Sequence, residues 1–116
     1  MRGNVTISGK DVGMLSSAAS PILYKRVFRK DWFKALTTSQ EDETGIESIT
    51  IFEEMGYIMA MQATKTTEQL AALSYNAFLE WVTQFEADDL LEAVDQIASI
   101  YNGQEQTSSE QKKEDG

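Results

Sequence analysis

The sequence predicts a mainly α-helical protein with a short N-terminal β-hairpin, about four to five helices and a disordered C-terminal tail. Three observations predict this fold class. Apolar and polar residues alternate near the N-terminus, apolar residues then recur at helical spacing through most of the chain, and the last residues carry no apolar side chains. A chain of 116 residues is long enough for one hydrophobic core. We therefore predict a single domain over residues 1–103 and a disordered polar tail over residues 104–116.

The predicted hairpin lies at the N-terminus. Residues 4–8 alternate as a half-buried strand does, and residues 12–15 can return as a second strand after a connection over residues 9–11. A glycine-containing connection of this length is typical of a β-hairpin. Because a lone two-stranded hairpin is marginally stable in water, we expect it to pack on helices or to pair with another chain.

Two helix starts follow the hairpin. Ser20 and Pro21 predict the first, since serine can cap free backbone N–H groups and proline at the first helical position loses no hydrogen bond. Asp31 predicts a second cap, which opens a short helix. The stretch over residues 37–45 is polar and acidic, without apolar periodicity, and is predicted to be a loop.

The densest apolar segment begins near Ile46 and predicts the central core helix, because one face carries Ile51, Phe52, Met55, Ile58 and Met59. The pattern over residues 63–75 is compatible with either a continuation or a break of this helix.

Two further helices are predicted beyond this segment. Ser74 can cap one that carries Phe78 and Phe85, and the acidic pair Asp88–Asp89 favours the N-terminus of the last. Asn102 and Gly103 form a plausible C-terminal stop for the last helix.

The composition closes most routes to catalysis. The chain contains no cysteine and no histidine, which excludes disulfides, zinc sites built from these residues, and Ser-His or Cys-His nucleophile pairs. Two carboxylate pairs remain, Glu53–Glu54 and Asp88–Asp89, but adjacent helix positions point about 100° apart and do not form a dyad or a compact metal cage. No glycine-rich phosphate loop is present. We expect no enzymatic activity, no cofactor and no metal.

The charge pattern limits the classes of partner. A net charge of −9 argues against nucleic acid, because phosphate neutralisation needs a basic surface. Every apolar stretch is interrupted well before the length of a bilayer span, so no membrane segment is expected. Half of the basic residues nevertheless lie in one short segment, namely Lys25, Arg26, Arg29, Lys30 and Lys34. These residues can steer a partner with a complementary surface, or they can simply be the solvated face of helices.

Several short motifs occur in an order that is similar to a known family. They are the turn over residues 7–10, Ala-Ala-Ser-Pro at 18–21 with the basic and aromatic run over 23–31, the helix over 52–60, and the Leu-Glu-Trp segment over 78–85. With these motifs, residues 4–103 resemble the tail assembly chaperones that siphophages of low-GC Gram-positive bacteria or their prophages encode between the tail tube and tape measure genes.

The resemblance implies a binding function. Such chaperones keep the aggregation-prone tape measure protein soluble until the tail tube polymerises around it. It further implies a place in the host cytoplasm, absence from the mature virion, and a longer frameshifted form, for which Lys112–Lys113 is compatible with an adenine-rich slippery run. The tail tube protein, this longer form and a second copy of the chain are further candidate partners.

The candidate protein-binding residues come from the basic and aromatic segment: Tyr24, Arg26, Phe28, Arg29, Trp32 and Phe33. At helical spacing the aromatic residues can equally be a core face with a charged flank. Two other functions remain open, a small phage structural or head–tail connector protein and a small protein-binding regulator.

Overall fold

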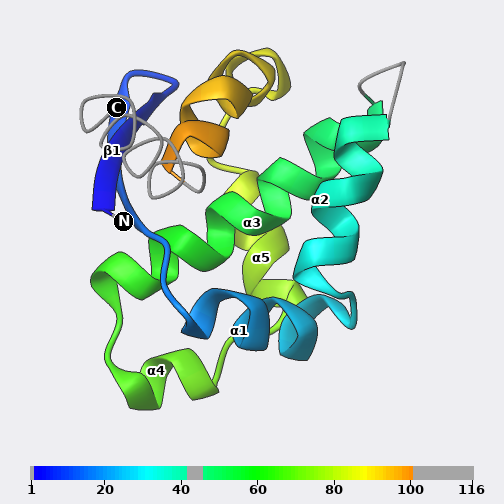
Figure 1. Cartoon of the computed structure of the whole chain (residues 1–116). Coiled ribbons are helices and arrows are strands. Elements are labelled where there is room, and N and C mark those ends of the chain that lie inside the picture. The colour runs from blue at the N-terminus through cyan, green and yellow to red at the C-terminus, as the bar shows by residue number, and fades with distance from the viewer. Residues whose placement is uncertain (1, 42–45, 101–116) are drawn as a thin grey trace, which may run out of the picture.

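The computed structural model describes residues 2–41 and 46–100, and it confirms the predicted fold class. The described chain is mainly helical with an N-terminal antiparallel hairpin (Figure 1). Its elements are β1 (Arg2–Ile7), β2 (Lys10–Leu15), α1 (Ala19–Phe28), α2 (Trp32–Glu41), α3 (Ile46–Thr64), α4 (Thr67–Ala71), α5 (Tyr75–Val82) and a last helical segment over residues 87–100. The described residues thus contain one helix more than expected, the short α4. The predicted tail over 104–116 lies outside the described residues.

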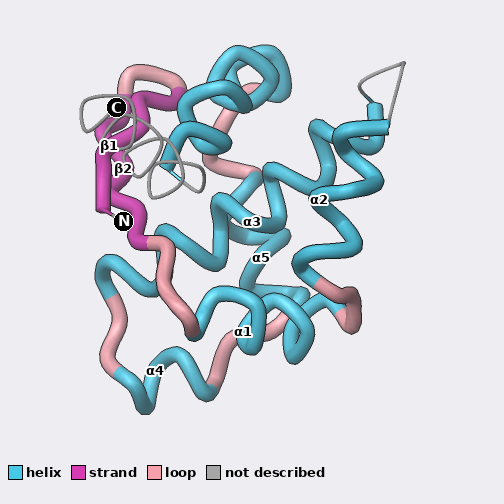
Figure 2. The backbone as a smooth tube through the Cα atoms, viewed as in Figure 1, coloured by secondary structure: helices cyan, strands magenta, loops and turns pink. Residues whose placement is uncertain are grey.

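The hairpin turns more tightly than predicted. The chain reverses over Ser8 and Gly9, whose φ angles of 52° and 76° are both left-handed. A two-residue turn with this backbone matches the twist of antiparallel strands, and Val5 pairs with Val12 across them. As expected for so small a sheet, the hairpin packs on helices: β2 contacts α3, and the last helical segment lies beside both strands (Figure 2).

The start of α1 differs from the prediction. Ser20 is not the cap, because α1 begins at Ala19 and the cap position is Ala18, which makes no side-chain bond. The hydroxyl of Ser17 instead accepts a hydrogen bond from the N–H of Ala19 at 3.1 Å. Ser20 is buried in the first turn, where its hydroxyl accepts from the N–H of Ser17 and donates to Gln62 of α3. The serine therefore joins two helices.

Helix α2 begins as predicted but extends further. The carboxylate of Asp31 accepts a hydrogen bond from the N–H of Lys34 at 2.9 Å, which confirms the cap. The predicted loop is wrong for residues 37–41, which are helical; the rest of it, residues 42–45, lies outside the described residues. Packing on α3 accounts for the difference, because α2 buries Ala35 and Leu36 and the carbonyl of Ser39 accepts a hydrogen bond from the hydroxyl of Ser48 on α3 at 3.0 Å.

Helix α3 is the centre of the fold, as predicted. It contacts β2, α1, α2 and α5, and Figure 1 shows it running between these elements. Its buried hydrophobic side chains are Ile51, Phe52, Met55, Tyr57, Ile58, Met59 and Ala60. Gly56 lets the last helical segment approach closely, because a Cβ there would lie 3.2 Å from Cδ1 of Ile97.

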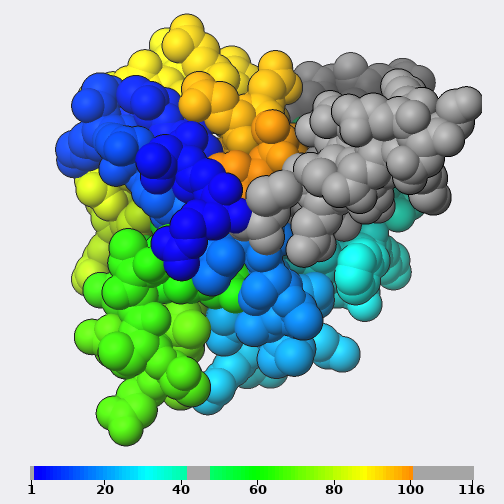
Figure 3. Space-filling view, turned by 60° about the vertical axis from the view of Figure 1, so that its left-hand side comes forward, coloured from blue at the N-terminus to red at the C-terminus, as the bar shows by residue number. Residues whose placement is uncertain are grey.

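The segment between α3 and α5 breaks the helix. Helix α3 ends at Thr64, and α4 follows with a capping box in which Thr66 and Gln69 exchange side-chain and backbone hydrogen bonds. Helix α4 has no buried residue and projects at the lower left of the space-filling view (Figure 3). Ser74 caps α5 as predicted, because its hydroxyl accepts from the N–H of Ala77 at 3.1 Å.

The last helical segment closes the core against the hairpin. Leu90, Ala93 and Ile97 are buried, and the pair Asp88–Asp89 lies in its first turn, as predicted. The hydroxyl of Ser8 donates to the carboxylate of Asp89 at 2.6 Å and accepts from the N–H of Glu86.

Candidate functional site

The structure separates the six candidate binding residues into two groups. Tyr24, Phe28 and Trp32 are buried. The ring of Tyr24 lies 5.2 Å from that of Phe28 and 5.4 Å from that of Trp32, and the ring of Phe28 lies 4.9 Å from that of Phe78 on α5. The first pair is tilted and the other two are edge-to-face, and such contacts at these distances are typical of an aromatic core. For these three side chains the core interpretation is the one that the structure supports.

The second group faces solvent. Phe33 is 61% exposed in the first turn of α2, and Arg26 and Arg29 are exposed on and just after α1. Sequence reasoning missed Ile22, which is 69% exposed. The sequence does contain a signal for this exposure, because Ile22 lies four residues before Arg26 and residues four apart share a helix face. We call Ile22, Arg26, Arg29 and Phe33 the outward set.

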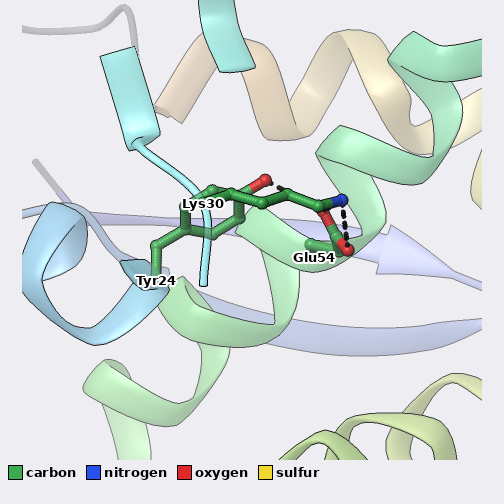
Figure 4. A network of polar contacts seen from close by, with 3 residues as sticks. All are labelled: Tyr24, Lys30 and Glu54. Carbon is green, nitrogen blue, oxygen red and sulfur yellow. Dashed lines mark hydrogen bonds and ion pairs between the residues drawn. The ribbon is translucent and has the colours of Figure 1, made fainter. Parts of the chain in front are cut away.

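Figure 4 shows a polar network in which Tyr24 of α1 and Lys30, just after α1, both contact Glu54 of α3. Glu54 is 4% exposed, and both of its carboxylate oxygens accept from the ammonium of Lys30, at 3.2 and 3.1 Å. One of them also accepts from the hydroxyl of Tyr24 at 2.8 Å. Burial, and secondly the charge of Glu54, raise the pKa of the Tyr24 hydroxyl. The tyrosine therefore stays a neutral donor, and the network holds a carboxylate that burial alone would destabilise.

The two carboxylate pairs, Glu53–Glu54 and Asp88–Asp89, make separate contacts in the fold and do not form one cluster. Glu53 is half-buried, and its pKa is raised by burial and then by the charge of Glu54. Asp89 holds the hairpin turn, as described above. Among the side chains that the structure describes, those of residues 2–41 and 48–100, no group of three or more acidic residues lies close enough to hold a metal ion.

A groove lies beside the polar network, between α2 and the first half of α3. Its volume is about 640 Å³, and it is lined by Arg29, Lys30, Asp31, Lys34, Ala35, Thr38, Thr50 and Ile51. The sequence placed four of these residues in the basic segment but gave no sign that α3 would form the opposite wall. The groove combines an apolar floor with a cationic rim.

None of the helices in the described ranges has both the length and the apolar character that a bilayer span requires. Comparison with models of known families, with curated proteins and with solved structures finds no match to this chain.

Proposed function

We propose that this chain is a phage tail assembly chaperone that binds the tape measure protein and keeps it soluble while the tail tube assembles. The sequence resemblance names the client. The structural observation that supports a binding role is the exposure of Ile22 on α1 and Phe33 on α2, two large apolar side chains from the segment that also exposes Arg26 and Arg29.

The outward set suits a client that is long, helical and aggregation-prone. Ile22 and Phe33 are large apolar side chains, and most of their surface is exposed to solvent and not packed in the core. An apolar stripe on a client helix can cover them, which removes apolar surface of both partners from water. The exposed arginines of the same segment can pair with acidic flanks of the stripe and favour one orientation.

The charge of the whole chain supports the same role. A chaperone that exposes apolar side chains must avoid binding its own copies. The net charge of −9 makes free copies repel one another and favours solubility. The proposal carries with it the remaining expectations: no catalysis, a place in the host cytoplasm, absence from the mature virion, and the tail tube protein or a longer frameshifted form as additional partners.

Genomic context and co-expression test the proposal. We expect a tail tube gene upstream and a very long tape measure gene downstream of the gene for this chain. Co-expression with a fragment of that tape measure protein should move the fragment from the pellet to the soluble fraction. An unrelated acidic helical protein of similar size is the control. No gain in solubility over this control would contradict the proposal.

A second measurement separates a chaperone from a structural protein of the virion. Mass spectrometry of purified particles should detect the tail tube and tape measure proteins but not this chain. Detection at a copy number that matches a ring or connector would instead identify it as part of the particle.

A further inference from the structure

The groove between α2 and α3 has the composition of a binding site for an amphipathic anion. Ala35 and Ile51 are buried core residues that also line it, so its floor is apolar. Arg29, Lys30 and Lys34 line its rim. At about 640 Å³ it falls within the size range of natural ligand pockets and can take large side chains of a peptide.

The charge around the groove is opposite to that of the rest of the chain. Three lining residues are cationic and one, Asp31, is anionic, whereas the whole chain has a net charge of −9. Lys30 is the one cation of the rim whose charge is compensated, by Glu54. Within the described residues, Arg29 and Lys34 form no ion pair. With Lys30 paired to Glu54, the lining keeps two cations, Arg29 and Lys34, against the one carboxylate of Asp31, so a ligand meets a net positive charge above the apolar floor.

We propose that this groove binds an acidic segment of a partner protein in which a large apolar side chain is flanked by aspartate or glutamate. The apolar side chain contacts Ala35 and Ile51, and the flanking carboxylates pair with Arg29 and Lys34. The occupant is a peptide rather than a nucleic acid, because two available cations can pair with two carboxylates but are too few to neutralise a run of phosphates. The inference deepens the proposed function and rests on it only in naming the client as the protein that supplies this segment.

Selection from a display library of random linear peptides on the full chain tests the specificity. The groove should enrich peptides in which a Leu, Ile, Phe or Trp lies within one helical turn of two or more acidic residues. Enrichment of basic peptides, or of apolar peptides without acidic residues, would overturn the proposal. So would the absence of enrichment over a blank surface.

Two matched pairs of variants then locate the binding site. Thr50 is exposed at the groove and Thr64 is exposed at the far end of α3, so Thr50→Trp fills the groove while Thr64→Trp makes the same change elsewhere. Lys34→Glu reverses a rim charge, and Lys65→Glu makes the same change outside the groove.

Fluorescence anisotropy with the most enriched peptide gives the readout. Thr50→Trp and Lys34→Glu should each weaken binding by about tenfold or more, and the two control variants should bind within about twofold of the parent chain. Equal binding of the peptide by all variants would show that the groove is not the binding site. Circular dichroism shows whether each variant folds; if Thr50→Trp does not, the exposed Lys34→Glu change decides the result alone.

The two proposals fail in different ways. If the parent chain does not solubilise the tape measure fragment but does bind acidic and apolar peptides through the groove, the proposed function is wrong and the groove serves another protein. If the parent chain solubilises the fragment and Thr50→Trp does so equally well, with no peptide enrichment, the groove inference is wrong and the proposed function stands.

Discussion

The inward and outward sides of residues 22–34 contrast sharply, although both belong to one short segment. On the inward side, Tyr24, Phe28 and Trp32 form the aromatic core against α3 and α5. On the outward side, Ile22 and Phe33 are more than half exposed. The contrast shows that aromatic residues among basic ones do not by themselves indicate a binding surface, because the same pattern also builds the core.

The basic residues of the segment divide in the same way. Lys30 reaches a buried carboxylate on α3 and stabilises the fold. Arg26 and Arg29 stay exposed and, within the described residues, form no ion pair. The side chains that stabilise the fold are therefore different from those that we propose for binding, and single substitutions can separate the two roles.

The largest expected difference in the free energy of unfolding is between truncating a buried phenylalanine and truncating an exposed one. Phe28→Ala removes a buried ring that contacts Tyr24, Tyr57 and Phe78, and should lower the free energy of unfolding by about 3–5 kcal/mol. Phe33→Ala removes an exposed ring and should change it by less than about 0.5 kcal/mol. Equilibrium denaturation in urea measures both. Equal losses would show that the two sides do not differ.

The next effect concerns the buried ion pair. Lys30→Met removes the ammonium and leaves the carboxylate of Glu54 buried with one hydroxyl partner. We expect a loss of about 1–3 kcal/mol, below that of a fully buried pair because water reaches the half-exposed Lys30. Lys65→Met, at an exposed lysine, is the matched control and should have little effect. A Lys30→Met variant as stable as the control would mean that the pair does not stabilise the fold.

Removing the hydroxyl of Tyr24 and removing that of Tyr57 should change the stability of the fold differently. Tyr24→Phe removes a donor to the carboxylate of Glu54 and should cost about 1–2 kcal/mol. The hydroxyl of Tyr57 is buried without a hydrogen-bond partner in the described structure, so Tyr57→Phe should be neutral or stabilise by up to about 1 kcal/mol. Thermal unfolding of both variants in one buffer tests the pair; a destabilised Tyr57→Phe would indicate that this hydroxyl does have a partner.

The smallest effect is a pH dependence. Burial raises the pKa of Glu53 above its ordinary value of 4.5, so the folded state binds this proton more tightly than the unfolded state does. The stabilisation from protonation is complete below 4.5 and is lost as pH rises through the folded-state pKa. Glu53→Gln removes this dependence. Its melting temperature should exceed that of the parent chain at neutral pH, and the difference should shrink on acidification; a constant difference would contradict the shift.

Local signals in the sequence were enough for much of the fold. The alternation at the hairpin, the caps at Asp31 and Ser74 and the periodicity of α3 are all properties of neighbouring residues. Ser20 was misplaced because Ser17, three residues earlier, also offers a hydroxyl to the helix start. The end of α2 is not predicted, because its Ser39 carbonyl is held by Ser48 of α3, a tertiary contact that apolar periodicity within one helix does not register.

The candidate site was harder to predict than the fold. Which aromatic residue of residues 24–33 is buried depends on the packing of α1 and α2 against α3, which lies well after them in the chain. The groove depends on the same packing, because Thr50 and Ile51 meet Lys30 and Lys34 only when α2 lies against α3. Sequence reasoning could identify the cationic segment but not the wall opposite it.

We propose that the outward set binds the client without contributing to the fold. The most direct measurement is the soluble fraction of the tape measure fragment when it is co-expressed with the parent chain or with Phe33→Glu. We predict that Phe33→Glu keeps the melting temperature of the parent chain and fails to solubilise the fragment. A variant with unchanged stability that solubilises the fragment as well as the parent chain does would contradict the claim.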